Sequence, residues 1–506
     1  MKVKDSKFIL QSRPLLEELL ARLLKRYPSA TILATDAKSM RYRVSRFMTS
    51  ADEDDLFSSR GFVVRVSDGV HSTEYSFNLI TKELLDDICR EIDEAAAMAG
   101  VVLPEGITES ETHAVYGSEA GQAGGLTEAE AAAEKTAAEL GDLKVADGRI
   151  YFTGASNCEI DPAEVSDEEI LQKLRDISGQ GLSLDERILD CICGASWQWY
   201  TKLFLSKDRD LMESILWTNG QVVTAAARGQ EIKTYYKGYS GLGGMECIQG
   251  MSEGVKECVD ATIDLLSSEP IVPGEYTCIC SPEVTGMIAH EAFGHGVEMD
   301  MFVKKRALAE KYVGEYVASP ILTMHDGALA AQESGSYFFD DEGEFAHDTI
   351  VIDHGILKSG ISDSRSAAAL GTEPTGNGRR ESYKRKTYTR MTNTYFEAGD
   401  STPEEMIASV DYGFLLENPS SGMEDPKNWG IQCMVNIARE IKDGKLTGRV
   451  FSPIVLTGYV PDLLKSITML GNKVELGGGG MCGKGYKEWV KVSDGGPYIK
   501  ATVRLG

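Results

Sequence analysis

Hydrophobic residues follow two different periods in the first hundred residues. Apolar positions spaced three and four apart predict helices over residues 15–27 and 81–98. Short stretches with apolar residues at every second position predict strands, and Asp68-Gly69 is a hairpin signal between two of them. We therefore expect an α+β domain over residues 1–103, built on an antiparallel sheet with helices. Its strands are predicted at residues 31–33, 41–44, 62–66 and 75–77.

The hydrophobic pattern stops over residues 104–147. This segment is rich in Gly, Ala, Glu and Thr and poor in large apolar residues, with helical spacing only over residues 127–140. A segment of this composition has too little apolar surface to build a core of its own. We expect an acidic linker or insertion here, and a domain boundary.

Helix and strand patterns return over residues 148–270, which we expect to form a second α+β region. Ser166 and Glu169 have the spacing of a capping box, which predicts a helix from that point to about Ile177. Residues 188–226 alternate like successive strands, with a turn predicted at Asn219-Gly220. A further helix is predicted over residues 253–266.

From residue 271 to residue 506 short strand patterns alternate with glycine-rich turns. This pattern predicts a larger, mostly β C-terminal domain. Two helices are predicted within it: one starts at Ser281, a good N-cap followed by Pro282 at the first helical position, and the other runs from Ser401 to about Val410. The overall expectation is an α+β fold with the helix after Ser281 inside the C-terminal domain.

Composition limits the classes of function. The chain has 506 residues and a net charge of −26, which argues against a nucleic-acid binder because such proteins need a basic footprint. No apolar run is long enough to span a membrane, and the charged N-terminus does not read as a signal peptide. The ten cysteines are scattered, as expected of reduced thiols in a cytoplasmic protein.

The helix after Pro282 carries the pattern HExxxH. His290 and His295 are candidate metal ligands, and Glu291 suits a general base for a metal-bound water. Residues five apart on a regular helix differ by roughly 140° of azimuth, so both can reach one metal only if the helix widens, as in a π-bulge. The alternative is two unrelated histidines on a buried helix. Glu298 would either orient a ligand histidine or be a surface charge.

A third candidate ligand lies far along the chain. Cys482 stands among glycines between residues 477 and 485, where the backbone could approach a metal closely. A thiolate is a strong zinc ligand, and the metal lowers the pKa of the thiol. The alternative is a glycine-rich turn with an idle cysteine.

Five motifs carry a resemblance to a known family. They are HEAFGHGVEMD from residue 290, DDEG from residue 340, PTGNGRRESY from residue 374, RMTNTY from residue 390 and MCGK from residue 481. In this order they resemble the TldD/PmbA family of zinc metallopeptidases, and its TldD branch more closely. The resemblance covers about half of the chain, from residue 271 onward.

The resemblance implies a zinc metallopeptidase that cleaves unstructured peptides. Zinc would be held by His290, His295 and Cys482, and Glu291 would activate the water on the metal. The presence of the metal motif implies the catalytic subunit type. It also implies either a TldE/PmbA-like partner subunit or a homodimer.

Four polar residues are candidates for substrate binding. Asn377, Asn393, Arg379 and Arg380 could donate hydrogen bonds to the oxyanion, and the arginines could also hold a peptide carboxylate or carbonyl. For the arginines the alternative is a solvated basic loop. A different class of function also remains: a non-catalytic interaction subunit of a peptide-processing complex, in which zinc only stabilises the fold (a zinc-stapled subunit). Glu291 favours the enzyme, because a structural site has no use for a carboxylate beside its ligand.

Overall fold

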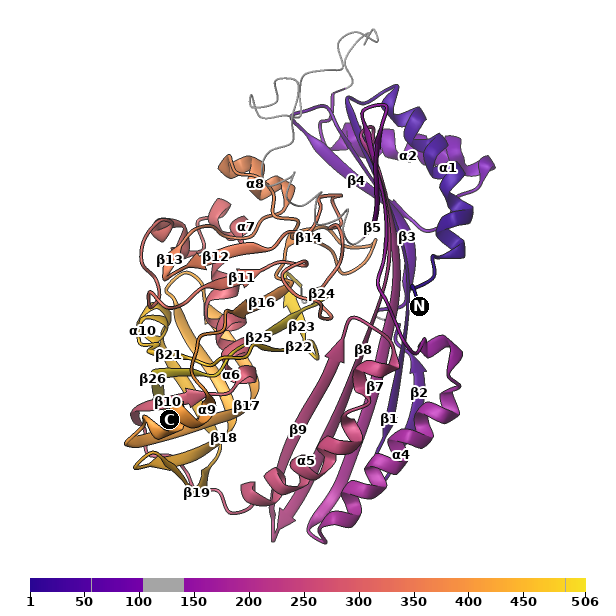
Figure 1. The fold of residues 1–506 in the computed structure, drawn as a ribbon. Helices are drawn as coiled ribbons and strands as arrows, with labels where there is room; N and C mark the ends of the chain where they lie inside the picture. Colours follow the sequence, from indigo (N-terminus) through magenta and orange to yellow (C-terminus); the bar gives the residue numbers. More distant parts are fainter. Residues whose placement is uncertain (56, 103–140, 487) are drawn as a thin grey trace.

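The computed structural model describes all of the chain except residue 56, residues 103–140 and residue 487, and its longest strands belong to one sheet (Figure 1). Within the described residues this sheet has nine strands. Seven of them form a continuous path in the order β4 (Ser72–Phe77), β3 (Ser59–Ser67), β1 (Ser29–Val44), β7 (Ile188–Leu205), β8 (Arg209–Arg228), β6 (Arg149–Ala155) and β5 (Gly141–Ala146). The other two lie beside this path: β2 (Thr49–Glu53) pairs with β1, and β9 (Glu231–Gly241) pairs with β8.

This sheet contains strands from both sides of the predicted linker. β1 pairs antiparallel with β7 from Ile32↔Leu205 to Val44↔Cys193. The linker prediction is wrong for residues 141–146, because Leu143 and its neighbours form β5 and pair with β6. The remaining residues of that prediction up to 140, including its helix at 127–140, lie outside the described residues. The domain boundary itself stays a prediction.

Helices cover one face of the sheet (Figure 1). Along β1, Ile32 joins a cluster with Leu16 and other residues of the N-terminal helices, whereas Leu33 points to the opposite face and joins Phe338. This alternation follows from the two-residue period of a strand. The capping box of Ser166 is confirmed. The covering helices are α1 (Lys7–Leu24), α2 (Leu85–Met98), α4 (Asp167–Leu184) and α5 (Met251–Leu265).

The C-terminal part contains a seven-stranded sheet, counted over the described residues. Five of its strands are, in order, β10 (Gly274–Cys280), β17 (Tyr412–Asp425), β18 (Gly430–Lys442), β20 (Ile454–Tyr459) and β26 (Ile499–Leu505). Because β10 pairs with both β17 and β26, these five strands close into a ring. β19 (Lys445–Phe451) and β21 (Met469–Leu470) lie beside the ring.

A second C-terminal sheet has six strands among the described residues, and two hairpins accompany it. Its order is β13 (Ile356–Leu357), β12 (Thr349–Asp353), β11 (Met324–Asp326), β16 (Asn393–Phe396), β25 (Ser493–Gly496) and β22 (Glu475–Gly477). The hairpins are β14 (Gly378–Arg379) with β15 (Tyr388–Thr389), and β23 (Met481–Lys484) with β24 (Glu488–Lys491).

The helix predicted after Ser281 lies between the two C-terminal sheets. It starts as α6 (Pro282–Met287), continues as the π-helix η4 (Ile288–Gly294), and contacts β17 on one side and β25 on the other. The expected α+β class is confirmed. The remaining helices are α7 (Met299–Val303), α8 (Ser364–Leu370), α9 (Pro403–Ala408) and α10 (Val460–Lys465), with 3₁₀ turns η1 (Lys82–Leu84), η2 (Pro162–Glu164), η3 (Met245–Ile248), η5 (His295–Val297) and η6 (Leu308–Tyr312).

None of the helices in the described part of the chain has both the length and the apolar character needed to cross a membrane.

Candidate metal centre

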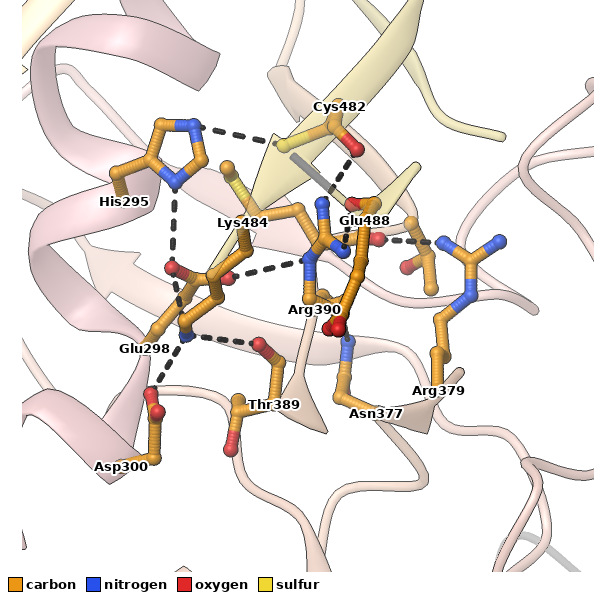
Figure 2. Close-up of polar contacts among 12 residues, drawn as sticks. His295, Glu298, Asp300, Asn377, Arg379, Thr389, Arg390, Cys482, Lys484 and Glu488 are labelled. Atoms are coloured by element: carbon orange, nitrogen blue, oxygen red, sulfur yellow. Dashed lines mark hydrogen bonds and ion pairs between the residues drawn. The ribbon is translucent and has the colours of Figure 1, made fainter. Parts of the chain in front are cut away.

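Three side chains from distant parts of the chain meet beside the π-helix. The ligand atoms of His290, His295 and Cys482 all lie within 4.8 Å of one another. The Cys482 Sγ is 3.5 Å from the His295 Nε2, and the two imidazole centroids are 5.2 Å apart. His290 belongs to η4, His295 begins η5, and Cys482 is in β23. Figure 2 shows the Cys482 side chain pointing toward the His295 ring.

The predicted widening of the motif helix is confirmed. A π-helix closes its hydrogen bonds five residues apart rather than four. Residues 288–294 adopt this form, which brings His290 and His295 to the same side of the helix. The backbone therefore resolves the roughly 140° mismatch that a regular helix would impose on this spacing.

The three side chains shift one another's protonation. Burial raises the pKa of the Cys482 thiol, but the nearby His295 and His290 imidazoles lower it well below its usual value. Burial lowers the imidazole pKa values, but the Cys482 charge raises that of His290 to about 8 and also raises that of His295. The site thus favours a thiolate beside positive charge. This donor set, together with a buried His290 Nδ1 that has no hydrogen-bond partner among the described residues, fits a zinc ion.

Glu291 stands at the edge of this group. Its Oε2 is 4.0 Å from the His295 Nε2, and 26% of its side chain is exposed, so water can reach it. Gly422 of β17 lies directly behind it. A Cβ at residue 422 would be 2.5 Å from the Glu291 Cγ, so only a glycine leaves room for this carboxylate.

Glu298 contacts His295, a candidate ligand, as one of the two sequence interpretations expects. Its Oε2 is 3.2 Å from the His295 Nδ1, and the residue is only 2% exposed, so the surface-charge alternative is wrong. Burial raises the pKa of the carboxyl, but Lys484 and other cations lower it to about 2. The ionised carboxylate accepts from Nδ1, which leaves the Nε2 lone pair of His295 for a metal.

The two asparagines predicted to bind substrate are fully buried and have partners within the protein. Asn377 donates to the Asp326 carboxylate and to the Arg390 carbonyl, both at 2.9 Å. Asn393 donates to the Ser336 hydroxyl at 2.9 Å and to backbone carbonyls. These contacts favour a role in holding the loops of the site. Their role in substrate binding stays a prediction.

The two arginines are also engaged within the protein. Arg379 donates to the carbonyls of Met391 and Lys491, each at 2.6 Å. Arg380 is paired with Glu74 at 3.0 Å, and 4% of its side chain is exposed, so it does not belong to a solvated loop. Substrate binding by Arg379 and Arg380 stays a prediction.

Sequence reasoning gave no role to three charged residues that lie beside the ligands. Lys484 contacts Glu298 at 3.0 Å and Asp300 at 2.7 Å, and Arg390 donates to the Cys482 carbonyl (Figure 2). All three stand inside the quoted motifs, but their burial is set by tertiary contacts that the hydrophobic pattern does not report.

Comparisons with known proteins point to one family of metallopeptidases. Residues 273–503 match the family model described as the PmbA/TldA metallopeptidase C-terminal domain. The chain is 31% identical to a metalloprotease of Methanothermobacter thermautotrophicus over 54% of this chain and 60% of that protein. It is 34% identical to a metalloprotease TldD homolog of Buchnera aphidicola over 48% of this chain and 50% of that protein. It is 32% identical to a zinc metalloprotease TldD homolog of Saccharolobus solfataricus over 45% and 50%.

The matched region thus spans half to 60% of the length of these relatives. Solved structures resemble the whole fold. TldE from Thermococcus kodakarensis gives a TM-score of 0.67 at 16% identity over 97% of this chain and 99% of that one. A Thermotoga maritima protein described as a candidate modulator of a DNA gyrase gives 0.72 at 15% identity over 98% and 100%. The C-terminal part of the chain, residues 273–503, is thus similar to the metallopeptidase domain of the TldD/PmbA family.

Proposed function

We propose that this protein is a zinc-dependent metallopeptidase of the TldD type, which cleaves unstructured peptides. The observation that carries the proposal is the meeting of His290, His295 and Cys482 within 4.8 Å, with the Glu291 carboxylate 4.0 Å from His295. A zinc ion bound by these three side chains would polarise the scissile carbonyl and lower the pKa of a water molecule toward about 7.

The protein's own residues supply the proton transfers. Glu291 takes a proton from the attacking water and delivers it to the leaving amine, which is general base and then general acid catalysis. Its partial exposure gives access to water, and Gly422 leaves the space in which it stands. Glu298 keeps the His295 ring oriented and fixes which nitrogen carries the proton.

The number of ligands supports an enzyme over a zinc-stapled interaction subunit. Structural zinc sites usually have four protein ligands, whereas catalytic sites have three and one open position. In the part of the chain that the structure describes, the group contains three side chains. The alternative, a zinc-stapled interaction subunit, predicts that replacing Glu291 has no effect on activity and that the metal has four protein ligands.

Partner and compartment belong to the same proposal. The fold shared with TldE supports assembly with a TldE/PmbA-like subunit, and a homodimer is the other form of the proposal. A cytoplasmic location would keep the Cys482 thiol reduced, as a metal ligand requires.

The test replaces Glu291 by Gln. The amide keeps the size of the side chain but cannot take a proton, so peptide cleavage should fall by about 10²- to 10⁴-fold. Zinc content and thermal stability should stay near wild type, because the ligands are unchanged. The matched control is Glu283→Gln, an exposed residue in the first turn of α6, which should retain full activity. The assay uses unfolded peptides, with and without a TldE-like subunit.

Two results would contradict the proposal. One is an active wild-type complex that loses nothing when Glu291 becomes Gln. The other is a cobalt-substituted protein whose spectrum shows four protein ligands and no exchangeable water, together with no cleavage of any peptide. In that case the zinc-stapled subunit is the better description.

A further inference from the structure

Two buried cations connect the separate segments that carry the ligands. Arg390 is 1% exposed, and 12% of the Lys484 side chain is exposed. Two acids accompany them, Glu298 at 2% and Asp300 at 8% exposed. Buried charges are costly unless they are paired, and these four balance one another.

Lys484 connects β23, the strand that carries Cys482, to the segment of residues 295–300, which begins with His295. It lies two residues after Cys482 in β23, so both side chains leave the strand on the same face. Its Nζ is 3.0 Å from the Glu298 Oε2, 2.7 Å from the Asp300 Oδ1 and 3.0 Å from the Thr389 carbonyl. The same Glu298 oxygen lies 3.2 Å from the His295 Nδ1. One carboxylate oxygen thus connects the ligand histidine with a lysine on the strand of the ligand cysteine.

Arg390 makes a second connection between the same two segments (Figure 2). Its guanidinium donates to the Cys482 carbonyl at 2.5 Å and to the Glu488 carbonyl at 3.0 Å, one on each strand of the β23–β24 hairpin. Its Nε lies 4.0 Å from the Glu298 Oε1. The planar fork of arginine suits this arrangement, since a lysine cannot reach both carbonyls and the carboxylate at once.

We propose that Arg390 and Lys484 are positioning residues, which set the separation of His295 and Cys482 before a metal binds. The inference rests on the proposed zinc site and extends it. His290 differs, because its Nδ1 has no hydrogen-bond partner in the part of the chain that the structure describes. The cations therefore preorganise one pair of ligands, and His290 completes the site from the π-helix.

The inference is tested by the zinc affinity of the full chain, measured by competition with a chromophoric chelator. Arg390→Lys keeps the charge but loses the fork, and Lys484→Met keeps the length but loses the charge. Each should weaken zinc binding about 10- to 100-fold, the range found for residues that orient metal ligands. The ligand-field spectrum of the cobalt-substituted protein should change as well, which a merely structural role would not produce.

Matched controls are available for both variants. Arg439→Lys removes an equivalent fork, between Glu417 at 2.7 Å and Asp264 at 2.9 Å, away from the ligands. Lys304→Met removes a lysine that is 2.7 Å from Asp300 in a salt bridge and is 46% exposed. Both controls should bind zinc like the wild type. If Lys484→Met does not fold, Lys484→Arg keeps a cationic donor and should retain most of the affinity.

Several outcomes would overturn the inference. Wild-type zinc affinity and an unchanged cobalt spectrum in folded Arg390→Lys and Lys484→Met would do so. An equal loss in Lys304→Met would assign the effect to Asp300 rather than to the tie between Lys484 and Glu298. If the variants lose affinity while the zinc-loaded wild type cleaves no peptide, the positioning role stands and the proposed peptidase function falls.

Discussion

Two regions of this protein contain buried ion pairs that connect different parts of the structure. At the interface with the nine-stranded sheet, the Lys202 Nζ lies 3.3 Å from Glu213 and 3.3 Å from Asp341. This contact joins strands β7 and β8 to the loop that carries DDEG. Beside the candidate metal ligands, Lys484 and Arg390 join β23 to Glu298, which contacts His295. Buried charged contacts therefore hold two layers of the fold together in the first region, and we propose that they set the distance between His295 and Cys482 in the second.

Further ion pairs show how much of the interface depends on the DDEG loop. Arg65 is 2.9 Å from Glu342, and Arg209 is 2.9 Å from Glu344. Around them, aromatic residues of both layers pack in one cluster that includes Phe152, Phe338 and Phe339. The interface thus combines apolar area with charge pairs, whereas the contacts beside the ligands are mainly polar. This difference predicts that the two regions respond differently to mutation.

The largest effect should come from Lys202→Met. Removing the lysine leaves Glu213 and Asp341 buried without their cation, which typically destabilises a protein by about 3–5 kcal/mol. The midpoint of thermal unfolding of the metal-free protein should fall accordingly. Zinc affinity of the folded fraction should stay near wild type, because no ligand segment is touched. Lys207→Met, at an exposed position two residues after the end of β7, is the control and should have little effect. A loss of zinc affinity as large as that of Lys484→Met would remove the distinction between the regions.

A smaller effect, of opposite sign, is expected at Lys491. This residue is 5% exposed, its Nζ lies 4.5 Å from the centre of the Trp217 ring, and none of the described residues forms a hydrogen bond with that Nζ. Burial lowers its pKa to about 7. Replacing a buried charge that lacks a hydrogen-bonded partner by an apolar side chain of similar volume should stabilise the protein, so Lys491→Met should gain roughly 2 kcal/mol at pH 6.

The pH dependence gives a sharper test of Lys491. Between about pH 7 and the usual lysine pKa near 10.4, the unfolded chain binds this proton and the folded protein does not, so wild-type stability should rise with pH. The advantage of Lys491→Met should therefore shrink between pH 7 and pH 9. Unfolding midpoints of both proteins across this range measure the difference. An advantage that is constant with pH would show that the effect comes from packing and not from the charge.

The smallest effect is expected at a helix cap far from both charged regions. Ser166 accepts from the Glu169 backbone N–H, and the Glu169 carboxylate accepts from the Ser166 backbone in return. Ser166→Ala should cost about 1 kcal/mol. Zinc affinity and the cobalt spectrum should not change. A change in either would mean that general loss of stability also weakens metal binding, and the variants at Lys484 would then need to be compared with this one.

Local sequence rules predicted the features that depend on neighbouring residues. The Ser166 cap and the α+β class followed from spacing alone, and the need for a widened helix followed from the distance between His290 and His295. The buried cations could not be found in this way, because Arg390 and Lys484 are polar residues in polar stretches. Their burial results from contacts between segments almost one hundred residues apart.

One local rule was misleading. Asn219-Gly220 is a strong turn signal, but both residues lie inside β8. The reason is close packing: a Cβ on Gly220 would lie 2.5 Å from the Met251 Sδ and 2.9 Å from Ile248. The glycine is needed where η3 and the start of α5 approach the strand. The sequence pattern cannot tell such a contact from a turn, because both require the absence of a side chain.

The contact between Gly422 and Glu291 has an evolutionary consequence. While a descendant of this protein keeps the carboxylate, any side chain at residue 422 would displace it, so that position is confined to glycine. A descendant that has lost the carboxylate is released from this restriction, and drift can then place a side chain on the strand. Such a change is difficult to reverse, because recovering the acid requires the glycine to return first. The identity of residue 422 would then record whether a lineage can still regain the carboxylate and, with it, the proposed catalytic role.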